Sequence, residues 1–188
     1  MMAKTKPFDT RKLVLLALLI AIVVVLQLLS VVFPVYPFRL ALVLVPIVVG
    51  AALIGPLAGL WLGGVFGFVV LISSPDVPLF MTFSPPATIL VILSRGLLAG
   101  LAAGLLYRLL AKRGNLLAVI CAAIITPIIN TGIFVLGLFI FFQPIVGDVI
   151  YFFVAFVLVN FLIELAINLV LSPTIVRLVQ YGQNRNNN

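Results

Sequence analysis

Arg95 and Glu164 are charged residues that stand inside long apolar stretches of this sequence. Other polar side chains occur in the same stretches, namely Thr126, Asn130, Thr131, Asn160 and Asn168. A guanidinium can hold a carboxylate through two parallel hydrogen bonds, while amides and hydroxyls pair with the amides and hydroxyls of a ligand. This combination of residue types predicts the binding of a small polar ligand that carries an anionic group.

The sequence offers little for catalysis or for metal binding. It has no histidine, which removes the commonest general base and metal ligand. Its lone cysteine, Cys121, lies in an apolar stretch and can form neither an internal disulfide nor a cysteine metal cluster. A membrane enzyme, the alternative class, would have to rely on Glu164 with Asn168. We therefore expect no catalytic residue, no metal and no cofactor.

The elements that hold these residues must lie in a membrane. Hydrophobic residues make up 65% of the 188 and charged residues only 8%, against about 25% charged in a typical soluble domain. A chain with so little polar surface needs hydrocarbon as its solvent. Its apolar stretches do not alternate between apolar and polar residues as the strands of a barrel would. We predict an all-α polytopic membrane protein.

Each membrane-spanning helix needs about 20 residues, so the chain has room for one domain, residues 1–188, that is a bundle of six transmembrane helices. The expected helices cover residues 13–33, 39–54, 57–72, 87–110, 116–142 and 150–179. Gly55-Pro56 predicts a tight turn, and the four prolines of residues 73–86 predict a long outer loop. Residues 1–12 are expected to form a cytoplasmic segment, and residues 183–188 a disordered tail.

The basic residues follow the positive-inside rule. Nine of the eleven lysines and arginines flank one set of helix ends: Lys4, Lys6, Arg11, Lys12, Arg108, Lys112, Arg113, Arg177 and Arg185. Such an excess is typical of cytoplasmic ends. The net charge of +7 therefore indicates topology rather than binding of nucleic acid. Both termini of this multi-pass protein of the cell membrane are expected in the cytoplasm.

Arg95 lies too deep to be a topology signal. It is eight residues into its helix, about 12 Å from the outer end at 1.5 Å per residue. An ionisable side chain at mid-membrane costs about 2.5–3.5 kcal/mol even on a lenient scale, so it needs a partner or a watery cavity. Two interpretations stay open: an ion pair of Arg95 with Glu164 that locks two helices together, or a ligand cavity that both residues help to line.

Small residues at four-residue spacing form a second pattern. They are Gly55, Gly59, Gly63 and Gly67 along the third helix, and Ala17 and Ala21 along the first. Small residues at this spacing let helix backbones approach closely in lipid. The pattern predicts either packing within the chain or a docking surface for another membrane subunit.

These features together resemble the substrate-binding S components of energy-coupling factor (ECF) vitamin transporters. The resemblance covers nearly the whole chain and rests on its length, the six expected spans, the Ala17-x-x-x-Ala21 pair and the segment PIVVGAALIGPLAGLWLGGVFGFVV. In that family the first three helices dock on a membrane-embedded coupling (T) subunit, and two cytoplasmic ATPases power transport. The resemblance implies docking through Ala17, Ala21, Gly59 and Gly63. The chain itself has no Walker A pattern, so hydrolysis must occur on another chain.

The resemblance also implies where the ligand binds. The family's pocket opens outward between helices 4 to 6 and the loops after helices 1, 3 and 5. Its counterparts in this chain are Tyr36, Arg39, Phe83, Ser84, Arg95, Asn130, Thr131, Asn160 and Glu164. For Arg39 there is an equally simple alternative, because an arginine at a helix end can extend its side chain to the lipid head groups.

A water-soluble vitamin is the expected ligand, and pantothenate is the first choice. Pantothenate has one carboxylate for Arg95, with two hydroxyls and an amide for the asparagines and threonine, and the sequence looks most similar to the pantothenate-type members. The fourth helix has only one aromatic residue, Tyr107, which disfavours a flat vitamin. Phenylalanines in the last two helices keep folate and riboflavin open. A self-sufficient secondary transporter or a channel is the remaining alternative.

Overall fold

A computed structural model describes residues 10–32, 42–143 and 147–187, and every regular element in these ranges is helical. The elements are α1 (Thr10–Val32), α2 (Leu44–Leu53), α3 (Pro56–Ser73), α4 (Val77–Phe83), α5 (Pro85–Leu110), α6 (Asn115–Gly137), the π-helix η1 (Leu138–Phe142) and α8 (Val149–Asn187). The prediction of an all-α protein is confirmed.

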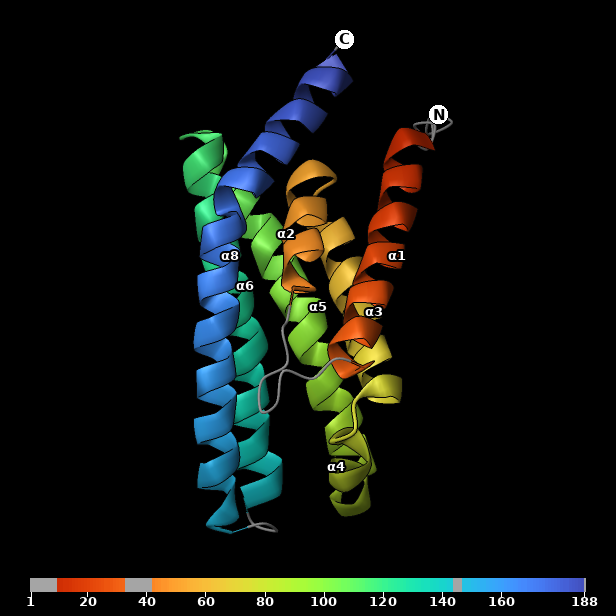
Figure 1. The fold of residues 1–188 in the computed structure, drawn as a ribbon, viewed down its shortest axis with the longest axis vertical. Helices are drawn as coiled ribbons and strands as arrows, with labels where there is room; N and C mark the ends of the chain where they lie inside the picture. Colours follow the sequence, from red (N-terminus) through yellow and green to blue (C-terminus); the bar gives the residue numbers. More distant parts are fainter. Residues whose placement is uncertain (1–9, 33–41, 144–146, 188) are drawn as a thin grey trace, which may run out of the picture.

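The long helices stand side by side in one bundle, with both termini at the same end and α4 at the opposite end (Figure 1). Five helical segments of the described chain are long and apolar enough to cross a membrane. They are Thr10–Val32, Pro56–Ser73, Pro85–Leu110, Asn115–Phe142 and Val154–Tyr181. The chain is thus a multi-pass membrane protein.

The sixth expected span is not found as a full span. We expected a helix over residues 39–54, but α2 has only ten residues, about 15 Å at 1.5 Å per residue, and residues 39–41 lie outside the described ranges. The helix ends before Gly55, whose φ of 130° only glycine adopts readily, and Pro56 then starts α3. The tight turn predicted at Gly55-Pro56 is confirmed.

The short helix α2 is a core helix. Its side chains are apolar on every face, and Leu44, Ile47 and Val48 are fully buried. A helix that is apolar all round must be covered by protein or by lipid. Here α1, α3, α5, α6 and α8 all contact it, so neighbouring helices cover it even though it is too short to span the membrane.

The prediction of a long loop over residues 73–86 was wrong, because this segment contains α4. Proline favours the first turn of a helix, where its missing N–H has no partner to lose. Pro78 stands in the first turn of α4, and Pro85 is the first residue of α5. Between the two helices, Ser84 has an extended backbone. The prolines therefore mark two helix starts rather than a loop.

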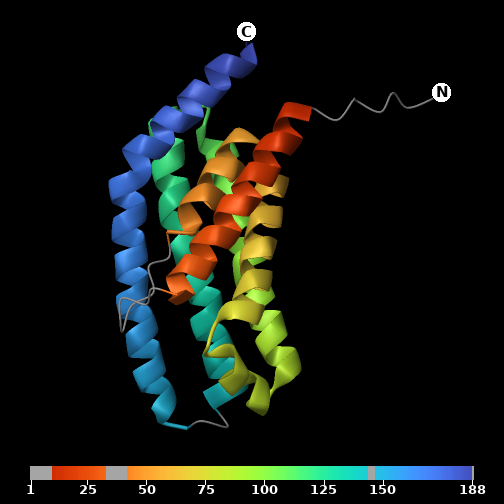
Figure 2. The same cartoon turned by 45° about the vertical axis from the view of Figure 1, so that its right-hand side comes forward.

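Helix α8 is longer than a membrane is thick. Its 39 residues correspond to about 58 Å, against roughly 30 Å of hydrocarbon. Pro173 lies inside it, and the last turns lean over the end of the bundle toward α1 (Figure 2). The backbone is helical to Asn187, where we had expected a disordered tail from residue 183.

Glycines hold α3 against α5 at backbone distance. A Cβ added at Gly59 or Gly63 would overlap the carbonyl of Gly100 or Gly96, and one at Gly67 would lie 2.9 Å from the carbonyl oxygen of Ile92. Gly59 and Gly63 are buried in this contact, so packing within the chain explains them and a docking role does not. The contact also fixes the segment of α5 that contains Arg95.

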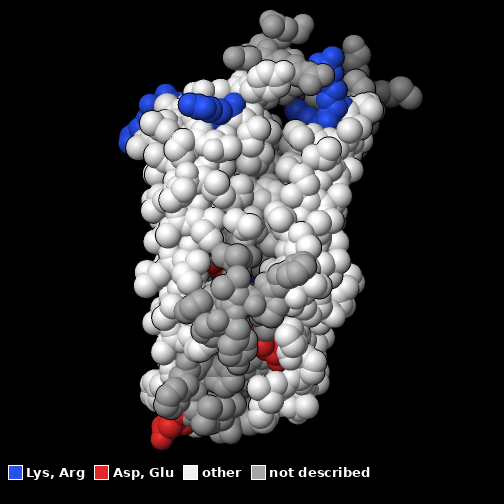
Figure 3. All heavy atoms as spheres, viewed as in Figure 1, with Lys and Arg blue, Asp and Glu red and all other residues white. Residues whose placement is uncertain are grey.

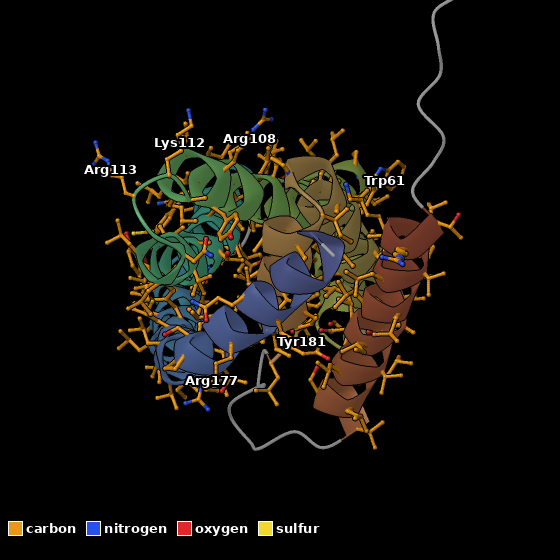
Figure 4. All side chains as sticks on the ribbon, turned by 90° about the horizontal axis from the view of Figure 1, so that it is seen from above. Trp61, Arg108, Lys112, Arg113, Arg177 and Tyr181 are labelled. Carbon is orange, nitrogen blue, oxygen red and sulfur yellow. The ribbon has the colours of Figure 1, made fainter. Side chains whose placement is uncertain are left out.

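Basic side chains gather at the end of the bundle where the termini lie (Figure 3). Seen from that end, Arg108, Lys112 and Arg113 project outward around the turn from α5 to α6, and Arg177 projects from α8 (Figure 4). Among the described residues, the basic groups that the sequence assigned to one side of the membrane therefore share one end of the structure.

The glycine contact predicts opposite effects for two glycine-to-alanine changes. Gly63→Ala should lower the free energy of unfolding by about 1–3 kcal/mol, because its methyl meets backbone rather than a flexible side chain. Gly132→Ala, in α6, meets no described atom within 4 Å and should be neutral or stabilising by up to about 1 kcal/mol, since alanine favours helix. Thermal unfolding in one detergent measures both. Equal melting temperatures for the two variants would contradict the close contact.

Candidate functional site

Arg95 lies where α3, α5 and α6 meet. Its side chain is half-buried, and its guanidinium carbon lies 4.7 Å from the ring centroid of Phe134 in α6 and 6.0 Å from that of Phe66 in α3. A cation over an aromatic face is attracted by the ring, more strongly where water is excluded. The two rings thus hold a fixed positive charge in an apolar setting.

Glu164 is the acidic counterpart on α8, with only 5% of its surface exposed. The side-chain nitrogen of Asn160 donates a hydrogen bond to its Oε1 at 3.3 Å. The side-chain nitrogen of Asn168 donates to its main-chain carbonyl at 3.0 Å. The prediction that these three residues share one inward face of a helix is confirmed.

Helix α6 brings the third group of polar residues. Asn130 and Thr131 are both buried. Arg95 and Asn130 are both near enough to Glu164 to favour its charged form. Polar groups from α5, α6 and α8 therefore lie in one region of the bundle, as their positions in the sequence had suggested.

Four buried oxygen atoms in this cluster have no hydrogen-bond partner within the described part of the chain. They are Asn130 Oδ1, Asn160 Oδ1, Glu164 Oε2 and Asn168 Oδ1. A buried polar atom left without a partner costs about 1–3 kcal/mol, and more if it is charged. Native proteins satisfy nearly all such atoms. The concentration of four such oxygens makes this cluster the candidate binding site.

The remaining predicted site residues stand apart from this cluster. Phe83 ends α4 with 41% of its surface exposed. Ser84 precedes α5 by one residue, about 16 Å along the helix from Arg95, and its carbonyl accepts a hydrogen bond from the Thr88 hydroxyl at 2.8 Å. Tyr36 and Arg39 lie outside the described residues.

An aromatic group beside Arg95 was not anticipated. Phe80 of α4 contacts Phe134 edge to face, with centroids 6.2 Å apart, and Phe142 of η1 at 4.9 Å. The sequence did signal Phe134, because it follows Asn130 by four residues and so shares its helix face. No comparable signal pointed to Phe80, which lay in the expected loop. The rings beside Arg95 thus come from α3 and α6 rather than from α5, whose one aromatic residue is Tyr107.

The two alanines of α1 point away from the bundle. Ala17 and Ala21 are both exposed, whereas Leu19 and Val23 on the same helix are buried against its neighbours. Exposed Leu18 and Ile22 flank the alanines. Of the two small-residue patterns in the sequence, only this one leaves a surface free for another subunit.

The fold and the site together define the class of this protein. It is a polytopic α-helical membrane protein with a buried polar cluster, some of whose atoms lack hydrogen-bond partners in the described chain. The sequence profile of the substrate-specific components of ECF transporters matches residues 11–176, and the chain belongs to that family. It is a family of transporter subunits, not a class of enzymes. No curated protein and no solved structure matches the chain.

The attraction between Arg95 and Glu164 predicts non-additive stabilities. Arg95→Met should lower the free energy of unfolding by about 3–5 kcal/mol, because it leaves a buried carboxylate without its cation. Adding Glu164→Gln should restore most of that loss, since no lone charge then remains. Thermal unfolding of both single variants and the double variant measures the coupling. A double variant as unstable as the sum of the single variants would show that the two charges do not interact.

Proposed function

We propose that this chain is the substrate-binding subunit of an ATP-driven ECF transporter and captures one molecule of a water-soluble vitamin. The buried polar cluster of α5, α6 and α8 carries the proposal, because its four unpartnered oxygens and its arginine suit a polar, anionic guest. Family membership supplies the transport role. The substrate reaches the cluster from the end of the bundle opposite the basic residues.

The basic end faces the cytoplasm of the cell in this proposal. Arg11 and Lys12 start α1, while Arg108, Lys112 and Arg113 lie around the turn after α5, all exposed. Lysine and arginine concentrate at cytoplasmic helix ends. Both termini then lie inside the cell, where two ATPases can act on the transporter.

Energy reaches the chain through a membrane-embedded coupling subunit docked on α1. Ala17 and Ala21 give α1 a shallow exposed strip, and small residues let a second helix approach closely. Gly59 and Gly63 play no part in this docking because α5 covers them.

Pantothenate is the proposed vitamin. Arg95 binds its single carboxylate, while Asn130, Thr131 and Asn160 take its hydroxyls and amide. The phenylalanines around Arg95 keep folate and riboflavin as alternatives, because aromatic faces stack on flat rings. The unpartnered acceptor oxygens favour a ligand with hydroxyl or N–H groups, and Arg95 favours one that also has a carboxylate, as pantothenate does and riboflavin does not.

Substitution of Arg95 tests the carboxylate contact. Removing one partner of a desolvated charge pair costs about 2–5 kcal/mol, so Arg95→Ala should weaken binding roughly 30-fold to several thousand-fold. Arg95→Lys should restore little, because lysine lacks the planar fork of arginine. Calorimetric titration with pantothenate, folate and riboflavin measures the affinities. Tight binding of folate or riboflavin, with none of pantothenate, would replace the proposed vitamin. Full affinity in Arg95→Ala would remove the carboxylate contact.

Bulk on the exposed strip tests docking. Ala17→Trp with Ala21→Trp should abolish vitamin uptake in cells while the purified chain keeps its affinity, because the strip lies away from the polar cluster. Leu162→Trp with Val170→Trp, two exposed positions on α8, is the matched control and should leave uptake intact. Normal uptake by the alanine variant would refute docking there, and loss of binding along with uptake would assign the alanines to internal packing.

A further inference from the structure

Glu164 holds two asparagines of its own helix. The amide nitrogen of Asn160 donates to its Oε1 at 3.3 Å, and the amide nitrogen of Asn168 donates to its main-chain carbonyl at 3.0 Å. Both of these Glu164 oxygens act as acceptors. Each of the two asparagines therefore turns its NH2 group toward Glu164.

The orientation of the asparagines decides what they offer to a guest. When the NH2 group faces Glu164, the amide oxygen faces elsewhere, and the amide oxygens of Asn160 and Asn168 are buried without a partner in the described chain. The amide oxygen of Asn130 on α6 is a third such oxygen. Glu164 Oε2 is a fourth such oxygen. These four atoms, here called the acceptor array, can be satisfied only by a group that donates hydrogen bonds.

We infer that Glu164 is a positioning residue that holds Asn160 with its amide oxygen free, so that the acceptor array selects a substrate with hydroxyl or amide N–H donors. The inference rests on the proposed function, since it concerns the substrate of the same site. Asn168 is held by the main-chain carbonyl, so the side chain at position 164 does not set its orientation.

The array also limits where the substrate carries its carboxylate. Acceptor oxygens cannot donate a hydrogen bond to a carboxylate, so the charged end of the substrate lies toward the Arg95 guanidinium. The substrate class is therefore a carboxylate with a donor-rich neutral segment.

The first test needs no ligand, because Glu164 is the only glutamate in the sequence. Protein labelled with ¹³Cδ glutamate and ¹⁵Nδ2 asparagine gives a single carboxyl signal in solid-state NMR. That signal should be dephased by the nearby Asn160 side-chain nitrogen, and less so in Asn160→Ala. Asn115→Ala is the matched control, because the Asn115 side chain accepts a hydrogen bond from Tyr107 at the basic end of the bundle. Absence of dephasing in the unmodified protein would overturn the inference.

The second test measures selectivity for donors. Pantothenate should bind roughly tenfold or more tightly than its analogue with both hydroxyls replaced by hydrogen, as two neutral hydrogen bonds would require. In Glu164→Gln the ratio of the two dissociation constants should fall toward one, because the glutamine amide can donate as well as accept and no longer fixes Asn160. Ser172→Ala, one turn further along α8, should keep the ratio, because its hydroxyl bonds locally to the Leu169 carbonyl.

The possible outcomes separate the two proposals. A purely structural role for Glu164 predicts that Glu164→Gln weakens both ligands equally, and an unchanged ratio would overturn the inference. If the unmodified protein binds neither ligand, pantothenate is not the substrate. In that case the NMR measurement by itself still decides whether Glu164 positions the asparagine, because the measurement needs no ligand.

Discussion

Charge burial in an apolar bundle is the constraint on which this structure depends. Arg95 and Glu164 stand in helices whose surroundings are otherwise hydrocarbon-like, where a lone charge is costly. The phenylalanine faces around Arg95 and the asparagines around Glu164 compensate for part of that cost. Four buried oxygens of the asparagines and Glu164 keep no hydrogen-bond partner in the described chain. The proposal of a polar ligand rests on these oxygens together rather than on any one residue.

The helices that carry the two charged residues are packed to different degrees. Helix α5, with Arg95, is held tightly, whereas α8, with Glu164, is less enclosed. Backbone contact between the glycines of α3 and α5 leaves no space for sliding, so Arg95 occupies a fixed place. Helix α8, which carries Glu164, packs mainly on α6 and α2 and exposes most of its remaining surface.

Sequence patterns predicted the parts of this molecule that depend on composition and on helical period. The all-α class and the shared face of Asn160, Glu164 and Asn168 follow from those alone. The short α2 and the helix α4 could not be predicted, because proline marks both helix starts and loops, and tertiary packing decides between them. The sequence could not show whether Gly59 and Gly63 pack within the chain or against another subunit, because small residues suit both kinds of contact. Phe80 contacts Phe134 because α4 places it there, so it could not be predicted without that helix.

Native mass spectrometry of the gently extracted protein tests the central claim most directly, because it weighs the chain together with whatever occupies the polar cluster. A site built for a polar guest predicts a species heavier than the chain by one vitamin-sized molecule, lost in Arg95→Ala and kept in Ser172→Ala. The bare chain mass in every preparation, after growth in medium rich in vitamins, would contradict that claim and leave the cluster as a structural contact between helices.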